Sequence, residues 1–465
     1  MAKKHTEIRF EEAIEEHLLE NGYAKGDSNL FDVRTALFPD DIIAFIEKSQ
    51  TNNWKHVREY NGTKAKDVLI SSLVKEINSK GALYVLRYGF KCFGRAFHLA
   101  YYKPNTNLNP DAWTDYRKNV LKIYRQVHFS EKQPGLSLDA VIAVNGIPIL
   151  TMELKNPMSG QNAENAKKQY KEDRDPRELI FQFKKRTLVH FAVDTDVVYM
   201  TTKLDGDNTF FLPFNKGYNL GEGNPPIKDN YKTAYLWEDV LSKDSLLDII
   251  GKYLHLEISE SKVYTEKGII KKKKETLIFP RYHQLDVVRK LIDNAKSNGS
   301  GHNYLVQHSA GSGKSNSIAW LAYRLSSLHD KNDVKIFHSV IVITDRRVLD
   351  RQLQNTIYQF EHTEGVVKKI DEDTKQLAEA LASGVPIIIS TLQKFPFIAE
   401  TLEKFEKEGK GLRIDTKGKR FAVIVDEAHS SQSGEAAVEL KKILNREGIE
   451  SVVAEQILDI EEKNL

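Results

Sequence analysis

The sequence predicts an α/β protein in which a mixed-sheet domain precedes a parallel-sheet domain. In the first half, the apolar segments LDAVIAV and IPILTMEL flank Asn145-Gly146, a dipeptide that is a strong hairpin signal between such runs. In the second half, the near-continuous apolar segments YLVQHSA, SVIVITD, VPIIISTL and FAVIVDEAH alternate with helix-like segments. Such an alternation is typical of a parallel sheet that is covered on both faces.

The first half contains further elements in a recognisable order. Helical periodicity in Phe10 to Leu19 predicts a helix, and Asn162 to Arg174 predicts a polar helix after the hairpin. Leu188 to Thr202 predicts short strands. The two halves meet at Lys271 to Lys274, and we interpret this lysine run as a solvated loop. We therefore place one domain at 1–262, a basic linker at 263–280 and a second domain at 281–465.

Length and composition limit the class of protein. The chain has 465 residues, enough for two or three domains, with 40% hydrophobic and 29% charged residues. Its net charge is only +3, so any contact with nucleic acid depends on local patches. The single cysteine, Cys92, excludes an internal disulfide or a cysteine-rich zinc site. A single cysteine fits a reducing cytosol, and no long apolar run or signal-peptide pattern is present, so we expect a cytoplasmic protein without a membrane partner.

The hairpin carries two carboxylates whose positions depend on strand pairing. A plain two-residue turn at Asn145-Gly146 would mix the two faces and place Asp139 opposite Met152. We instead predict a three-residue loop with Gly146 in a bulge position, which pairs Ala143 with Ile147. In this register one face is entirely apolar, and Asp139 lies diagonally across from Glu153.

This arrangement predicts metal-dependent chemistry. Two carboxylates that would repel each other are a suitable ligand pair for Mg²⁺. With Mg²⁺ on Asp139 and Glu153, a phosphodiester oxygen is polarised and a water is activated, while Lys155 positions that water or stabilises the charge on phosphorus. The alternative, for the hairpin taken alone, is an edge hairpin with a solvated polar face.

The second half begins with a phosphate-loop pattern, HSAGSGKS, that opens a predicted helix. Backbone N–H groups in such a loop, together with the helix N-terminus, bind phosphates. Lys314 is expected to reach the terminal phosphates, and the Ser315 hydroxyl is expected to hold Mg²⁺. The nucleotide-binding loop residues are Gly311, Ser312, Gly313, Lys314 and Ser315. The strict pattern has glycine where this chain has His308.

An Asp-Glu-Ala-His motif follows the apolar strand Phe421 to Val425. An aspartate at the carboxyl end of a strand beside a phosphate loop orients Mg²⁺, and a neighbouring glutamate activates the attacking water. We therefore assign Asp426 to metal and nucleotide binding and Glu427 to catalysis.

The two motifs together resemble a superfamily 2 helicase or translocase. ITDRRVLDRQL and ISTLQKF resemble that family's intermediate motifs, and FPRYHQLDVVRKL falls where the family has an adenine-recognition glutamine. The resemblance implies that Gln284, with Arg281, contacts the adenine of ATP.

The nuclease-like hairpin upstream of this motor resembles the motor and cleavage (R) subunit of type I restriction enzymes, in which a PD-(D/E)xK nuclease domain precedes two RecA-like domains. VNGIPILTMELKNP, LVHFAVDTDVVYMTT and FLPFNKGYNLGEGNPP carry this similarity. The resemblance implies nuclease roles for Asp139, Glu153 and Lys155. Some members have a glutamine and a tyrosine four apart after the hairpin. This chain has Gln169-Tyr170 followed by Arg174, so only Gln169 is carried over.

The resemblance implies an Mg²⁺-dependent endodeoxyribonuclease coupled to ATP-dependent translocation along double-stranded DNA. Its implied partners are the modification (methyltransferase) and specificity subunits. We interpret the chain as a fragment that ends after the first motor domain and expect weak ATP binding without efficient hydrolysis. Lys184-Lys185-Arg186 is a candidate phosphate-binding patch, with a solvated face as the alternative. Two other functions stay open: a helicase or remodeller with an inactive nuclease-like domain, and a non-enzymatic module that docks on a methyltransferase.

Overall fold

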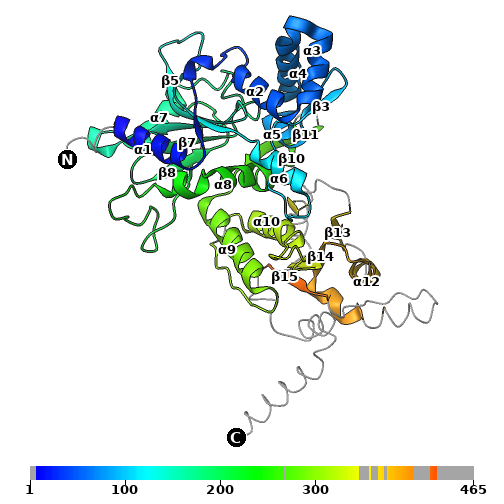
Figure 1. The fold of residues 1–465 in the computed structure, drawn as a ribbon. Helices are drawn as coiled ribbons and strands as arrows, with labels where there is room; N and C mark the ends of the chain where they lie inside the picture. The colour runs from blue at the N-terminus through cyan, green and yellow to red at the C-terminus, as the bar shows by residue number, and fades with distance from the viewer. Residues whose placement is uncertain are drawn as a thin grey trace. The chain divides into compact units, whose positions relative to one another are not determined.

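The computed structural model forms two compact units, residues 1–283 and 284–465 (Figure 1). It describes residues 7–265, 268–309, 311–344, 356–357, 365–370, 374–398, 401 and 419–426. The units divide between His283 and Gln284, and the domain limits drawn from the sequence stay a prediction. In the described part of the chain, no helix has the length and apolar character needed to cross a membrane.

The first unit is built on a seven-stranded mixed sheet with the strand order β1-β4-β5-β6-β7-β8-β9. The β1/β4 and β6/β7 pairs are parallel and the other neighbouring pairs are antiparallel. The strands are β1 (Ala24–Lys25), β4 (Leu121–His128), β5 (Ser137–Val144), β6 (Ile147–Leu154), β7 (Val189–Val193), β8 (Val198–Thr201) and β9 (Leu212–Pro213). The short strands β2 (Phe90–Cys92) and β3 (Arg95–Phe97) form a separate pair.

Helices surround this sheet. They are α1 (Glu7–Glu20), η2 (Ser28–Leu30), α2 (Pro39–Ser49), α3 (Thr51–Asn61), η3 (Gly62–Lys64), α4 (Ala65–Lys80), α5 (Ala82–Tyr88), α6 (Pro110–Arg117), η4 (Pro157–Ser159), α7 (Ala163–Glu172), η5 (Leu236–Val240), α8 (Lys243–Asp248) and η6 (Ile249–Tyr253). Helix α7 begins at a capping box on Asn162 and packs on β6 and β7 through Ala166 and Tyr170. Strand β6 is buried along its whole length between β5 and β7, so polar residues on it are withdrawn from solvent.

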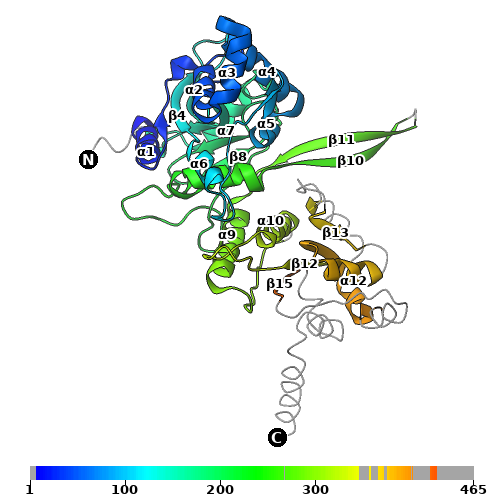
Figure 2. The same cartoon turned by 45° about the vertical axis from the view of Figure 1, so that its right-hand side comes forward.

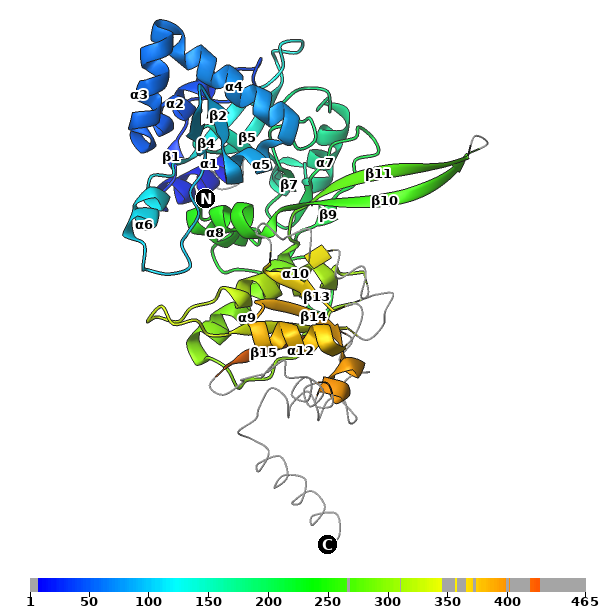
Figure 3. The same ribbon diagram turned by 90° about the vertical axis from the view of Figure 1, so that its right-hand side faces the viewer.

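The lysine-rich segment is not the solvated loop expected from the sequence. Strands β10 (His255–Thr265) and β11 (Gly268–Ile278) pair along their full length as an antiparallel ribbon, and Lys271 to Lys274 lie within β11. The expectation was wrong because β-branched and aromatic residues such as Val263, Tyr264 and Ile270 favour extended pairing. In Figures 2 and 3 the ribbon extends away from the rest of the first unit.

The second unit contains a four-stranded parallel sheet with the order β13-β14-β12-β15. Its elements are α9 (Tyr282–Asn298, which begins at the end of the first unit), α10 (Lys314–Ser326), β12 (Ser339–Thr344), β13 (Val367–Lys369), α12 (Thr374–Ser383), β14 (Ile387–Thr391), η7 (Leu392–Phe397) and β15 (Phe421–Val425). Helix α12 packs against the sheet through a core that includes Leu377, Leu381, Ile341 and Ile388 (Figure 3). The mixed sheet and the parallel sheet confirm the predicted fold class.

One predicted strand of the second unit is wrong. The apolar segment that begins at Tyr304 has no strand over residues 304–309, and the side chain of Leu305 is 82% exposed. Apolar residues form a strand only where a neighbouring strand pairs with their backbone. None of the described strands pairs with this segment.

Candidate functional site

The β5–β6 hairpin closes with the two-residue turn that the sequence reasoning rejected. Val144 pairs with Ile147, and Asn145 and Gly146 both have positive φ, 52° and 86°. The Asn145 side chain accepts a hydrogen bond from the Val120 backbone at 2.7 Å and donates to Leu99 O, which holds the turn in place. A Cβ at Gly146 would collide with Ile42, so only glycine fits there.

A β-bulge then changes the pairing along the strands. Ala143 pairs with Pro148 but Ile142 pairs with Leu150, so Ile149 is the extra residue. The prediction that excluded the two-residue turn was wrong, because it assumed that β5 and β6 keep one pairing register along their whole length. Beyond the bulge, even-numbered residues of β5 face even-numbered residues of β6, as they do in the predicted register. The continued register places Asp139 directly across from Glu153 rather than diagonally.

Lys155 and Asp139 are in direct contact at the carboxyl end of β6. Asp139 Oδ2 accepts a hydrogen bond from Leu154 N at 2.8 Å and lies 3.4 Å from Lys155 Nζ. Lys155 Nζ also contacts Glu7 Oε1 at 3.0 Å. Burial by itself lowers the pKa of Lys155, but the charges of Asp139 and Glu7 outweigh it and raise that pKa. The lysine is therefore held in its charged form between two carboxylates.

Glu153 is fully buried and is paired with Arg174. Arg174 Nε donates to Glu153 Oε1 at 2.7 Å, and the arginine side chain is itself only 1% exposed. Glu153 Oε2 has no hydrogen-bond partner in the described part of the chain. Burial and then the charge of Asp139 raise the pKa of Glu153 well above its usual range, against the opposing effect of Arg174. A cation beside Oε2 would favour the charged carboxylate.

Two glutamates of α1 join Asp139, and the sequence reasoning missed them. Glu7, Glu11 and Asp139 each place one carboxylate oxygen within 4.8 Å of the others. The sequence does contain a signal, because Glu11 and Glu15 follow the apolar residues Phe10 and Ile14 and are buried with them on the inner side of α1. A carboxylate beside the apolar stripe of a helix is withdrawn from solvent and requires a partner.

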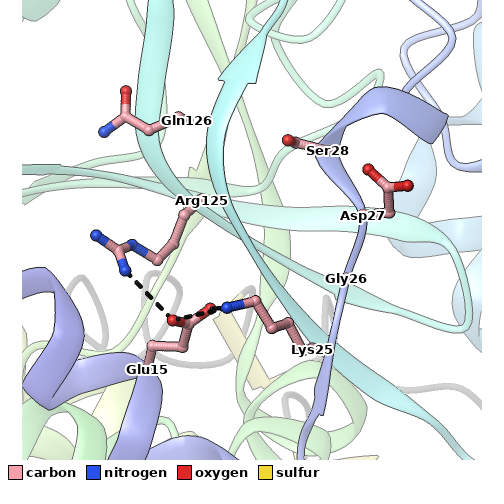
Figure 4. A pocket seen from close by; sticks show the side chains of 7 residues that line it. All are labelled: Glu15, Lys25, Gly26, Asp27, Ser28, Arg125 and Gln126. Carbon is pink, nitrogen blue, oxygen red and sulfur yellow. Dashed lines mark hydrogen bonds and ion pairs between the residues drawn. The ribbon is translucent and has the colours of Figure 1, made fainter.

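Arg125 supplies one such partner. Its Nη2 donates to Glu11 Oε2 at 2.8 Å, and its Nη1 lies 3.3 Å from Glu15 Oε2. Glu15 also contacts Lys25 at 3.1 Å. Glu15, Lys25 and Arg125 line a hollow of about 510 Å³ together with Gly26, Asp27, Ser28 and Gln126 (Figure 4). Arg125 therefore orients the α1 glutamates from the side of this hollow.

Behind Glu153, a buried hydrogen-bond chain joins β6, α7 and β7. Thr151 Oγ1 contacts the Tyr170 hydroxyl at 2.7 Å and His190 Nδ1 at 2.8 Å. Burial lowers the pKa of His190 to about 3, so the imidazole is neutral near pH 7. Gln169 is half-buried, and no hydrogen bond in the described structure joins its side chain to Asp139, Glu153 or Lys155. Its role stays a prediction.

The basic patch expected at Lys184-Lys185-Arg186 does not form as a phosphate-binding surface. Arg186 is fully buried and donates to Thr35 O at 2.6 Å, while Lys184 is paired with Glu275. The expectation was wrong because the fold buries Arg186, while the half-buried Lys184 and Lys185 are held by Glu275 and by Asn78 O.

In the second unit, the glycine loop leads directly into α10, whose first residue is Lys314. Gly311 and Gly313 have φ of 74° and 82°, the left-handed region that glycine adopts without strain. Ser312 is buried, and Gly313, Lys314 and Ser315 are half-buried. The predicted loop residues therefore lie at a helix N-terminus, where backbone N–H groups are free of helical partners.

Gln284 lies against this loop. It is 3% exposed, and its Nε2 donates to Gly313 O at 2.9 Å. Arg281 is half-buried and precedes α9 in the first unit. Adenine contact by both residues stays a prediction.

Asp426 follows β15, and its backbone N–H donates to Ile343 O at 2.9 Å, so it lies beside the carboxyl end of β12. Glu427 lies outside the described residues, and its catalytic role also stays a prediction.

Two family models match two separate regions of the chain. Residues 6–209 match the model of the type I restriction enzyme R protein N terminus. Residues 283–449 match the SWI2/SNF2 ATPase model. The candidate nuclease residues lie in the first region and the glycine loop in the second. The two matches confirm the resemblance to the N-terminal part of a type I restriction enzyme R subunit.

Individual proteins that are similar to this chain are also endonuclease subunits of type I restriction enzymes. In Methanocaldococcus jannaschii, the endonuclease subunits named provisionally for the type I enzymes MjaVIIIP and MjaIXP are 25% identical over 350 residues and 29% identical over 317 residues. The HindI endonuclease subunit of Haemophilus influenzae is 25% identical over 329 residues. These alignments cover 71%, 66% and 66% of this chain but only 31%, 28% and 27% of the relatives. The chain thus spans less than a third of the length of these relatives.

Proposed function

We propose that this chain, which carries the R-protein N-terminal region and an SNF2-type ATPase region, is the DNA-cleaving and ATP-dependent translocating subunit of a type I restriction-modification complex. One observation carries the proposal. Asp139, Glu153 and Lys155 converge at the ends of the paired strands β5 and β6, inside the region that matches the R-protein model.

The residues of this centre suit a hard divalent cation such as Mg²⁺. Carboxylate oxygens are its preferred protein ligands, and Glu153 Oε2 is a buried oxygen without a hydrogen-bond partner among the described residues. Asp139 belongs both to the predicted pair with Glu153 and to the group with Glu7 and Glu11. We therefore assign Mg²⁺ to Asp139 and Glu153, with the α1 glutamates as additional ligands.

The bound Mg²⁺ would polarise the scissile phosphodiester and lower the pKa of a water molecule. Lys155, which is kept charged by its neighbouring carboxylates, donates a hydrogen bond toward the phosphate oxygen on which negative charge develops. Arg174 keeps Glu153 from rotating away, and Arg125 does the same for Glu11. The side chains are thus oriented before DNA arrives.

The second unit would bind ATP. Backbone N–H groups at the N-terminus of α10 would cradle the phosphates, and Lys314 would neutralise the terminal charge. Ser315 and Asp426 would hold the accompanying Mg²⁺, and Glu427 would activate the attacking water. Double-stranded DNA and the modification and specificity subunits are the proposed partners.

The test is Mg²⁺-dependent nicking of supercoiled DNA by the chain, with and without the modification and specificity subunits. Glu153→Gln and Lys155→Ala each remove a group that acts in the transition state, so we expect nicking to slow by at least about 100-fold. The matched control is Glu16→Gln on the exposed side of α1, which should nick at the wild-type rate.

Two outcomes would count against the nuclease assignment. Unchanged nicking by Lys155→Ala would place the chemistry elsewhere. Calorimetric Mg²⁺ binding that is the same in the wild type and in Asp139→Asn, combined with no nicking under any condition, would favour an ATP-dependent motor with an inactive nuclease-like domain.

A further inference from the structure

The β10–β11 ribbon is a feature that the nuclease and ATPase assignments leave unexplained. Each strand has 11 residues, and the two form a sheet of their own that is separate from the seven-stranded sheet. At the usual rise per residue, each strand is roughly 35 Å long. The ribbon projects from the first unit in two different views (Figures 2 and 3).

The base of the ribbon is tied to the first unit. His255 and Leu277 are buried, and Thr202 Oγ1 donates to Leu277 O at 2.7 Å. Further along, the side chains of Ser259, Lys273 and Lys274 are exposed. A two-stranded ribbon in water is marginally stable at best, so its exposed part offers two faces and two edges to a partner.

The ribbon carries positive charge on both of its faces. Residues 271–274 are four consecutive lysines, and successive residues of a strand belong to opposite faces. Lys273 and Lys274 are successive residues and therefore lie on different faces, and both are exposed. Across the ribbon, Glu260 is opposed to Lys273, whereas the other three lysines are opposed to Ser259, Ser261 and Lys262. By sequence the two strands carry five lysines and three glutamates, Glu257, Glu260 and Glu275, so the ribbon has a net positive charge.

Positive charge on both faces fits duplex DNA better than it fits a flat acidic protein surface, which would contact one face. The major groove is about 12 Å wide, admits a two-stranded ribbon and is bordered by a phosphate strand on each side. Lysines contact such phosphates without reading base sequence. Arg186 is buried and Lys184 is paired with Glu275 at the base of the ribbon, so the exposed Lys273 and Lys274 are better placed for this contact than residues 184–186.

We propose that the β10–β11 ribbon is a DNA-binding arm that enters the major groove of duplex DNA and contacts the phosphates of both strands through Lys271 to Lys274. The proposal rests on the proposed action of the chain on DNA and adds the surface that holds the duplex. The arm binds without sequence preference, in keeping with contacts to phosphates alone.

The first test measures binding of a 30-base-pair duplex to the full chain by fluorescence anisotropy in EDTA, so that cleavage does not contribute. Changing the four lysines to glutamine should weaken binding at least tenfold near 0.1 M salt and reduce the slope of log K against log salt by about two to four. Changing all four to arginine should preserve binding.

The matched control changes four exposed lysines of the α3–α4 region, Lys55, Lys64, Lys66 and Lys75, to glutamine. This variant has the same net charge as the ribbon variant, and its affinity should stay within about twofold of the wild type if bulk charge is unimportant. Unchanged binding by the ribbon variant, or an equal loss in both variants, would overturn the proposal. Because no metal is present, a failure of the nuclease assignment does not affect this readout.

The second test asks whether the two faces of the ribbon contact the two strands of the DNA. Cys92 is buried, so Lys273→Cys and Lys274→Cys variants can be labelled selectively with a photo-cross-linker. We expect one position to cross-link mainly to one DNA strand and the other to the opposite strand. Cross-links to one strand only would overturn the groove geometry, and cross-links to the specificity or modification subunit in place of DNA would show a protein-docking arm.

Discussion

The two candidate centres of this chain are built from different groups. The centre on β5 and β6 consists of buried charged side chains, with Glu153 0%, Arg174 1% and Lys155 6% exposed. The loop before α10 consists mainly of backbone, with Gly311 exposed and Lys314 half-buried. In the first centre the charges neutralise one another before any ligand arrives, whereas the second is a glycine loop at the N-terminus of α10. Stability and ligand binding are therefore coupled in the first centre and largely separate in the second.

The largest effect should follow removal of the buried arginine. Arg174→Met leaves the fully buried Glu153 without its partner, so we expect a loss of about 3–5 kcal/mol in the free energy of unfolding. Urea unfolding, with hydrogen exchange at β5 and β6, measures it. Arg177→Met is the control because its pair with Asp175 is exposed, and it should leave the free energy of unfolding nearly unchanged. Equal losses in the two variants would contradict the difference between buried and exposed pairs.

The second effect is a pH dependence in the first centre. Burial lowers the pKa of His190 from 6.5 to about 3. Below pH 6.5, His190 becomes protonated in the unfolded chain but stays neutral in the folded chain. The contribution of His190 to the free energy of unfolding therefore falls as the pH falls toward 3, by at most about 1.4 kcal/mol per pH unit. His190→Gln should lose this slope in urea unfolding measured from pH 7 to pH 4. His308→Gln, in the half-buried histidine of the loop, should lose a smaller slope.

A third effect separates backbone strain from packing in the second centre. Gly313 and Gly299 have nearly the same positive φ, 82° and 77°, so alanine costs about 1–2 kcal/mol at either position. A Cβ at Gly313 would also collide with Gln284 Nε2, whereas Gly299 has open space. Gly313→Ala should therefore be the more destabilising and should also lose binding of a fluorescent ATP analogue. Restoration of its stability by Gln284→Ala would confirm the collision, and equal stability of the two alanine variants would contradict it.

The smallest stability change should come from the loop lysine. Lys314→Ala removes a half-buried side chain and should change the free energy of unfolding by less than about 0.5 kcal/mol, while ATP-analogue binding falls at least tenfold. Lys155→Ala, in contrast, should lower both stability and DNA cleavage, because it leaves Asp139 and Glu7 without their shared cation. A large loss of stability in Lys314→Ala would remove the distinction between the two centres.

Short-range patterns in the sequence predicted much of the fold. The Asn-Gly dipeptide located the hairpin, and the apolar segments at Ser339–Thr344, Ile387–Thr391 and Phe421–Val425 located parallel strands. The helix after the hairpin lies within the predicted range Asn162 to Arg174. Each depends on residues that are close together in the chain. The exceptions are the segment at Tyr304 and the lysine run, where pairing with another strand decided the outcome.

The candidate nuclease centre was predicted only in part, for the same reason. Parity along β5 and β6 placed Asp139 and Glu153 on one side, but the bulge at Ile149 decided that they lie directly opposite. The arginine that pairs with Glu153 and the glutamates that join Asp139 come from other elements. Lys155 and Glu7 are separated by 148 positions, and no local pattern specifies such a contact.

The sequence by itself determined the chemistry that is available: carboxylates and a lysine on one hairpin, a glycine loop at a helix N-terminus, and four consecutive lysines. Those features follow from residue type and spacing, which act over a few residues. The tertiary structure decided which charges are paired, which are buried and which remain exposed. It buried Arg174 and Arg186 and left Lys273 and Lys274 in solvent, because burial and Coulomb interactions depend on distances that only the packed fold sets.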